Sequence, residues 1–117
     1  MIQKENFLEL ETKIEPLVKQ KKLKSNEAKQ LLDQYYTLMI HYLEQINQIE
    51  YFDINKIEEY PIIPMNFIER YHYINERKYH FMGYRQMVTL INELIKMNAR
   101  YQLKRKREAK LNNDNQK

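Results

Sequence analysis

Residues 25–47 read SNEAKQLLDQYYTLMIHYLEQIN and carry the strongest periodic pattern in the chain. Apolar side chains recur there every three or four residues, at Ala28, Leu31, Leu32, Tyr35, Leu38, Met39, Tyr42, Leu43 and Ile46. Because an α-helix turns once in about 3.6 residues, this spacing places them on one side of a helix. Ser25 or Asn26 has a side-chain oxygen that suits the helix N-cap. The pattern predicts an amphipathic helix from about Asn26 to about Asn47.

The segment before this helix repeats the pattern more weakly. Between Glu5 and Leu23, apolar residues stand at Phe7, Leu10, Ile14, Leu17 and Val18. Pro16 lies inside this segment and has no backbone N–H to donate. We therefore expect a helix that bends or splits near Ile14, followed by a basic stretch over residues 19–24.

The segment after the central helix is irregular and contains two prolines. Asp53 has a side chain that can cap a short helical turn ending near Tyr60. Pro61 and Pro64 bracket two isoleucines, and each proline restricts the residue before it to extended geometry. The stretch predicts a rigid, apolar, proline-bracketed connector at residues 60–65 that packs on the core.

A short helix is predicted directly after this connector. Asn66 and Glu69 have the spacing of a capping box, so a helix should run from Phe67 to about Ile74. Asn75 should end this helix or cap the next one.

The last helix should begin between residues 76 and 79 and continue past Leu103. Its stripe toward the core comprises His80, Tyr84, Met87, Leu90, Ile91, Leu94, Ile95, Asn98 and Tyr101. Gly83 lies in its first turns and costs about 1 kcal/mol relative to alanine, which favours the close approach of another backbone there. After Leu103 the apolar residues thin out, and residues 112–117 should be disordered.

Composition favours one all-α domain. The 117 residues include one Gly and three Pro, too few turn formers for a β-sandwich or barrel. Cysteine is absent, which excludes disulfides and thiolate metal sites. No apolar run approaches the roughly 20 residues that span a bilayer, and the N-terminus has no signal-peptide core. We predict a small bundle of about four helices over residues 1–111, in the cytoplasm, with a polar tail at residues 112–117.

The formal charge of +4 is concentrated at the C-terminal end. Residues 96–117 hold eight Lys or Arg against two acidic residues, an excess of six, so residues 1–95 carry a net charge of −2. The candidate nucleic-acid contacts are Arg100, Lys104, Arg105, Lys106 and Arg107. Such a cluster can neutralise a few phosphates without reading sequence. The alternative is a solvated helix end, where the helix dipole favours cations.

Residues 58–85 concentrate aromatic and basic side chains, with seven Tyr or Phe, three Arg and two His. The candidate partner-binding residues are Arg70, Arg77, His80, Tyr84 and Arg85. The guanidinium group of arginine forms paired hydrogen bonds with carboxylates and phosphates, and Arg and Tyr are frequent in binding hot spots. In the alternative interpretation, each arginine pairs with a nearby glutamate, taken from Glu58, Glu59, Glu69 and Glu76.

The same region resembles a known family. Pro64 is followed by Glu69-Arg70, by Tyr73-Ile74 with Glu76-Arg77, and then by His80 and Tyr84-Arg85-Gln86. This order, over roughly residues 61–103, is similar to that of the YpoC-like family of small bacterial proteins. The resemblance implies no catalytic residues, because no activity is established for that family. It implies a setting near DNA replication and repair, since family members are often encoded beside such genes.

The sequence favours a binding module over an enzyme. It has no Gly-rich phosphate loop, no HExxH and no nucleophile motif, and the single Glu-x-x-His pair, Glu69 and His72, is too little for a di-iron site. We predict a non-enzymatic accessory module without cofactor, metal or membrane. Its partner would be a protein or a nucleic acid, contacted through residues 66–85 and the basic C-terminal end. The alternative is a protein–protein adaptor or homodimer that uses spare apolar surface at Met65, Phe81, Met82 and Met97.

Overall fold

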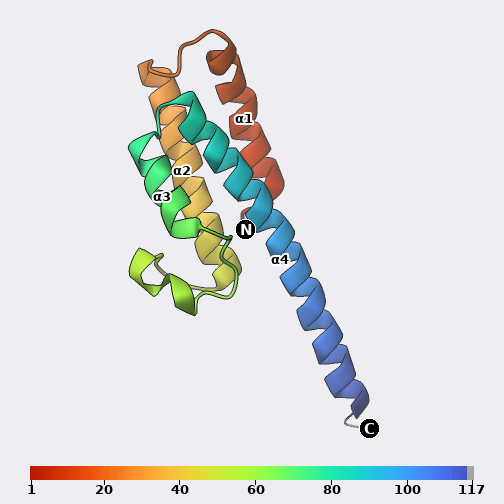
Figure 1. Cartoon of the computed structure of the whole chain (residues 1–117). Helices are drawn as coiled ribbons and strands as arrows, with labels where there is room; N and C mark the ends of the chain where they lie inside the picture. The colour runs from red at the N-terminus through yellow and green to blue at the C-terminus, as the bar shows by residue number, and fades with distance from the viewer. Residues whose placement is uncertain (116–117) are drawn as a thin grey trace.

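The chain folds as an all-α bundle, which confirms the predicted fold class (Figure 1). The computed structural model describes residues 1–115, with side chains described through residue 112. Within that part there is no strand, and the elements are α1 (Lys4–Lys19), α2 (Asn26–Asn47), the 3₁₀ helix η1 (Ile54–Glu59), α3 (Phe67–Glu76) and α4 (Phe81–Asn115). Helix α2 packs on both α1 and α4, and α3 packs on α4.

The shared interior is built from the apolar stripes of the helices. It includes Phe7 and Ile14 from α1, Leu32, Tyr35, Met39 and Leu43 from α2, Ile74 from α3, and Tyr84, Met87, Leu90, Ile91 and Leu94 from α4. The Phe7 ring meets the rings of Tyr35 and Tyr42 edge-on, at centroid distances of 5.9 and 5.5 Å. The predicted stripe of the last helix therefore faces the core, except at His80, which precedes α4 and is exposed.

Helix α2 has the predicted bounds. The Ser25 hydroxyl accepts a hydrogen bond from the Ala28 N–H at 3.2 Å and so caps the first turn. The helix ends where Gln48 enters the left-handed region at φ 56°. The N–H groups of Gln48 and Ile49 then bond back to carbonyls of the last turn, which satisfies acceptors that the helix leaves free.

Helix α1 is continuous, so of the two predicted alternatives near Ile14, a bend or a split, the split is wrong. Pro16 lies within α1, and the helix continues to Lys19. Proline removes the hydrogen bond to the carbonyl of Thr12, four residues earlier. Both Thr12 and Pro16 are exposed, so water can reach this side of the helix and solvate that carbonyl.

The connector from α2 to α3 packs on the core, as predicted. The buried side chain of Asn47 accepts from the Ile62 N–H at 2.8 Å and donates to the Ile62 carbonyl at 3.0 Å. These two bonds satisfy the backbone of Ile62, whose side chain is only 1% exposed. The predicted cap of η1 is also confirmed, because Asp53 accepts from the Asn55 N–H at 2.9 Å.

Helix α3 begins at Phe67, as predicted, but its cap and the role of Asn75 differ from the predictions. Asn66 adopts the left-handed conformation at φ 56° and makes no side-chain cap bond, so no capping box forms with Glu69. Asparagine tolerates this conformation better than most residues, and here it turns the chain out of the connector. Asn75 lies inside α3, where its amide donates to the Tyr71 carbonyl and accepts from the Tyr36 hydroxyl.

Gly83 explains how α4 can start so close to the end of α3. A Cβ atom built on Gly83 would lie 1.8 Å from the carbonyl oxygen of Arg77, which caps the C-terminal end of α3. The expectation that another backbone comes close at this glycine is therefore confirmed. Helix α4 begins at Phe81, later than predicted, because residues 77–80 form the reversal between the two helices.

The second half of α4 extends away from the bundle (Figure 1). The molecule measures 62 × 29 × 22 Å, and from Gln102 to Asn112 every residue is exposed. Helix α4 is assigned to Asn115, within the residues 112–117 that were predicted to form a disordered tail. Residues 116–117 lie outside the described part, and the disorder of the tail stays a prediction. None of the helices in residues 1–115 combines the length and apolar character needed to cross a membrane.

Candidate functional site

The arginines predicted to form one contact surface are used in different ways. Arg70 is an internal connector between α3 and α4, because its guanidinium pairs with Glu93 and donates to Gln86 at 3.1 Å and to the Met65 carbonyl at 3.2 Å. Its side chain is only 16% exposed. A guanidinium with these partners has few donors left for a ligand, so the prediction of Arg70 as a contact residue is not supported by its surroundings.

Arg77 is held at the end of α3. Its guanidinium lies 4.3 Å from the centroid of the Tyr73 ring and 3.3 Å from the Glu76 carboxylate. This is the internal pairing that the alternative interpretation expected for Arg77. The side chain is 45% exposed, so solvent still reaches it.

Tyr84 is a core residue, and its prediction as a partner contact is wrong. The side chain is 0% exposed, and its hydroxyl donates to the Glu15 carboxylate at 2.9 Å. The neighbouring Tyr35 ring lies 5.6 Å away, and its hydroxyl donates to Glu11 at 2.9 Å. Burial raises the pKa of Tyr35 and Tyr84 well above the ordinary value, and the adjacent carboxylates raise it further. Sequence periodicity placed Tyr84 in the helix stripe, and that assignment is the correct one.

His80 and Arg85 remain exposed, but they do not complete a shared arginine cluster. Arg85 lies on α4 near Tyr84, where its charge lowers the pKa of that buried hydroxyl against the larger effect of burial. His80 lies in the reversal between α3 and α4. Of the five predicted residues, one is buried, two are paired with glutamates, and two are accessible.

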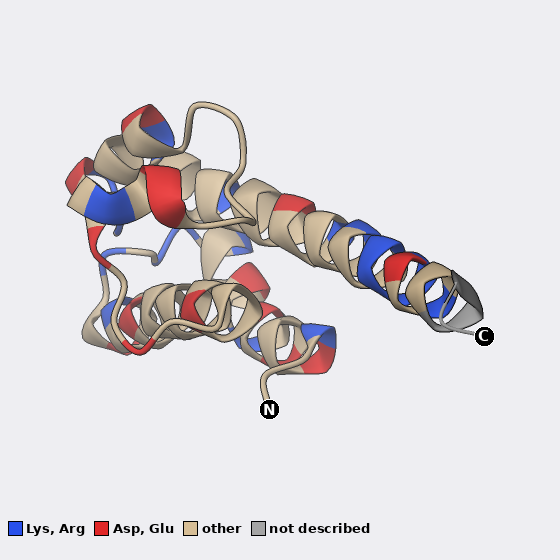
Figure 2. Ribbon diagram, turned by 90° about the horizontal axis from the view of Figure 1, so that it is seen from below, with Lys and Arg blue, Asp and Glu red and all other residues tan. Residues whose placement is uncertain are grey.

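The basic residues near the C-terminus are accessible. We define the basic end of α4 as residues 100–110, whose cations are Arg100, Lys104, Arg105, Lys106, Arg107 and Lys110. All of them are exposed, and Glu108 is the one acidic residue among them. Figure 2 shows these charges gathered on the part of α4 that extends from the bundle. The guanidinium of Arg105 lies 5.9 Å from the Tyr101 ring centroid.

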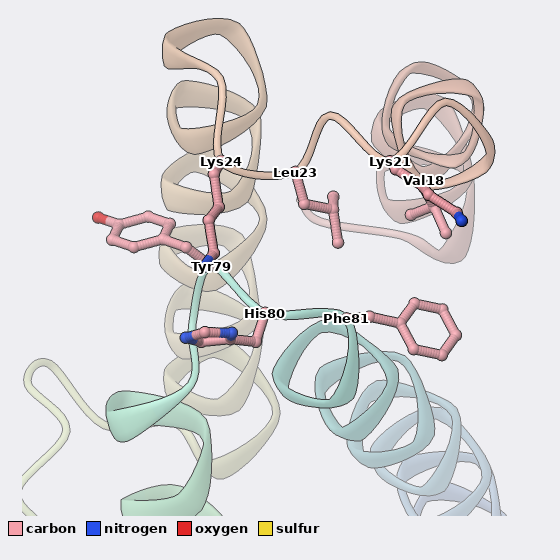
Figure 3. Close-up of a pocket in the computed structure, with 7 residues that line it drawn as sticks. All are labelled: Val18, Lys21, Leu23, Lys24, Tyr79, His80 and Phe81. Atoms are coloured by element: carbon pink, nitrogen blue, oxygen red, sulfur yellow. The ribbon is translucent and has the colours of Figure 1, made fainter.

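A pocket lies at the other end of the molecule, where two connections meet (Figure 3). We call it the end pocket. It has a volume of about 500 Å³ and is lined by Val18, Lys21, Leu23, Lys24, Tyr79, His80 and Phe81. The first four residues belong to the end of α1 and its connection to α2. Tyr79 and His80 belong to the reversal before α4, and Phe81 is the first residue of α4.

Local hydrogen bonds position both walls of the end pocket. Lys21 has a left-handed φ of 57°, and the Lys22 N–H bonds back to the Leu17 carbonyl at 2.8 Å. This arrangement is a typical helix C-cap, and it turns the chain toward the pocket. On the other wall, the His80 N–H bonds to the Arg77 carbonyl at 3.0 Å.

A polar cluster beside the end pocket joins α2 to the reversal. The Asp33 carboxylate lies 2.9 Å from the Lys78 ammonium and accepts from the Tyr79 hydroxyl at 2.8 Å. These two partners lower the pKa of Asp33. Burial alone would lower the pKa of Lys78, but the pairing with Asp33 outweighs it, and the pKa is raised. The cluster keeps Tyr79 in place at the pocket wall.

The sequence pattern did not identify the end pocket. Residues 19–24 stood out as a basic stretch, but their distance from His80 along the chain gave no reason to combine them. One feature of the sequence that could have indicated a basic surface there is the absence of any acidic residue between Glu15 and Glu27.

Glu69 and His72, the single pair considered for a metal, are both exposed on α3. Within the described part of the chain, no three His, Asp or Glu side chains converge to hold a metal ion.

Comparison with known proteins identifies the family. The model of the YpoC-like protein family matches residues 2–106. No curated protein and no solved structure matches the chain. The match extends beyond the region of resemblance at residues 61–103 and includes α1 and α2. The chain therefore belongs to the YpoC-like family.

Proposed function

We propose that this chain is a non-enzymatic accessory module that binds nucleic acid through the basic end of α4. The observation that carries the proposal is the exposure of all six cations of that segment on a helix that extends beyond the bundle. The surface predicted at residues 66–85 supports binding less well, because Arg70 and Arg77 are paired and Tyr84 is buried.

The dimensions of the basic end suit contact with phosphates. From Arg100 to Lys110 an α-helix rises about 15 Å, and its diameter with side chains, about 10–12 Å, fits the major groove, which is about 12 Å wide. The four consecutive cations at residues 104–107 point in different directions around the helix, because successive residues are about 100° apart. Such a distribution suits backbone phosphates on both sides of a groove more than base edges on one side. We therefore propose binding that depends strongly on salt and weakly on sequence.

Charge reversal in the basic end tests this function. In the variant R105E/R107E, we expect weaker binding to a fluorescent DNA duplex. The slope of log affinity against log salt concentration should decrease in magnitude by about two, because two phosphate contacts are lost. The matched control is K4E/K13E, which changes the net charge equally on the exposed surface of α1. The control should keep the slope of the unmodified protein. Failure of the unmodified protein to bind DNA or RNA at low salt would reject the proposal.

Self-association is a second candidate, which the exposure of large apolar side chains favours. Met65 is 81% exposed, Met82 58% and Phe81 46%, whereas Met97 packs against the core in part. We expect a homodimer that uses these side chains to lose stability when Met65 and Met82 are changed to serine. Light scattering over a range of concentrations measures the mass, and a monomer throughout removes this candidate.

A further inference from the structure

The end pocket forms a second basic region, at the opposite end of the molecule from the basic end of α4 (Figures 1 and 3). None of its lining residues is acidic, and two of them, Lys21 and Lys24, are exposed lysines. The first turn of α4 begins at Phe81, so the positive end of the helix dipole also lies at this pocket. The electrostatic surroundings therefore favour an anionic ligand.

The remaining walls of the end pocket are apolar. Val18 and Leu23 project into the pocket from the end of α1 and its connection to α2, and Phe81 lies across from them at the start of α4 (Figure 3). The Phe81 side chain is 46% exposed, so a large apolar surface is open to solvent at the edge of the pocket. A volume of about 500 Å³ lies within the usual range of ligand pockets, about 300–1,000 Å³. The ligand should thus combine negative charge with an apolar group.

The aromatic residues do not favour a nucleotide base as that apolar group. A base binds well where free aromatic faces can stack on it. The Tyr79 ring already has the ammonium groups of Lys29 and Lys78 over it, at 5.5 and 5.3 Å from its centroid. Opposite Phe81 stand the aliphatic side chains of Val18 and Leu23, which suit an aliphatic or aromatic amino-acid side chain better than a stacked base.

We propose that the end pocket binds an acidic peptide segment of a partner protein. An apolar side chain of the peptide packs between Leu23 and Phe81, and flanking carboxylates pair with Lys21 and Lys24. Lysine suits this role, because its ammonium is a point charge that accepts carboxylates from several directions. This site is independent of the basic end of α4, so one module can hold a nucleic acid at one end and a protein segment at the other.

The test uses the full chain and a fluorescein-labelled peptide with the sequence Asp-Asp-Phe-Asp-Asp, measured by fluorescence anisotropy at physiological salt. The double variant K21E/K24E should bind the peptide at least about tenfold more weakly, because each attraction becomes a repulsion. The matched control is K19E/K22E, whose exposed lysines lie at the end of α1 and on its connection to α2 but do not line the end pocket. The control should change the affinity by less than about threefold, since solvent and salt screen distant charges.

Two further comparisons separate a pocket from general attraction between charges. A peptide with Ser in place of Phe, and the variant F81A, should each weaken binding by about tenfold, because apolar burial is lost. Far-UV circular dichroism and urea unfolding show whether each variant keeps the fold. The variant R105E/R107E should bind the peptide normally, so failure of the proposed nucleic-acid function leaves this test intact.

Several outcomes would overturn the proposal. The first is that the unmodified protein does not bind the peptide. The second is that K21E/K24E and K19E/K22E lose affinity for the peptide equally. The third is that the Phe and Ser peptides bind with equal affinity. Displacement of the peptide from the R105E/R107E variant by a single-stranded oligonucleotide would assign the pocket to nucleic acid instead.

Discussion

The backbone of Gly83 lies directly against the carbonyl group of Arg77 at the end of α3. Because a Cβ atom would lie 1.8 Å from the Arg77 carbonyl oxygen, alanine at this position must push α3 and α4 apart. We expect G83A to lower the free energy of unfolding by roughly 1–3 kcal/mol, the usual cost of overpacking, although alanine favours helix by about 1 kcal/mol.

Urea unfolding followed by circular dichroism measures this effect. T89A is the matched control, because Thr89 is exposed on the same helix and already has a Cβ atom. The control should be neutral or slightly stabilising. A G83A variant as stable as T89A would contradict the close approach of the two backbones.

Buried polar groups at the residue scale are matched to specific partners. Asn47 is bonded to both backbone groups of Ile62, and Arg70 joins α3 to Glu93 on α4. Each pair connects segments distant in sequence, and within the described part no buried side-chain N or O lacks a partner. These residues therefore determine how the connector and α3 attach to the bundle.

At the scale of elements, α4 has two halves with different surroundings. Its first half contributes Tyr84, Met87 and Leu90 to the core, whereas from Gln102 to Asn112 no residue is buried. We expect removal of residues 102–117 to leave the melting temperature nearly unchanged, because no buried contact is lost. The helical signal in circular dichroism should fall only by the share of the removed residues.

The truncated chain should also lose DNA binding, because it lacks five of the six cations of the basic end. Peptide binding at the end pocket should persist. A marked drop in the melting temperature would contradict the independence of the removed half from the core.

At the scale of the whole molecule, stability should fall in alkaline solution. Tyr35 and Tyr84 have raised pKa values because they are buried next to carboxylates, and burial raises the pKa of Tyr36 to about 12. In the unfolded chain tyrosine ionises near pH 10. Their stabilising effect is therefore complete below about pH 10 and is lost as the pH rises further.

The variant Y35F/Y84F tests this dependence through unfolding free energies between about pH 8 and pH 12. It should be less stable than the unmodified protein near neutral pH, because the bonds to Glu11 and Glu15 are lost. Its stability should fall less steeply above about pH 10. Equal slopes for both proteins would show that other groups cause the alkaline loss.

On the acid side, the lowered pKa of Asp33 contributes stability that disappears below about pH 4.

Local structure was predictable where it depends on nearby residues. The periodic spacing in residues 26–47 determined the bounds of α2, Ser25 its cap, and Asp53 the cap of η1. The errors arose where local rules compete. Asn66 resembled a capping residue but adopts a left-handed turn, and Pro16 resembled a helix breaker but lies on a solvated face.

The amino-acid sequence by itself determined that the chain is helical, which residues face the interior, and that positive charge collects near the C-terminus. Only the tertiary structure decided which charges are free. Arg70 is paired with Glu93, 23 residues further along, while Lys24 and His80 meet at one pocket from separate connections. The physical reason is that periodicity is a local property of one helix. The pairing of polar groups depends instead on which faces of different helices meet.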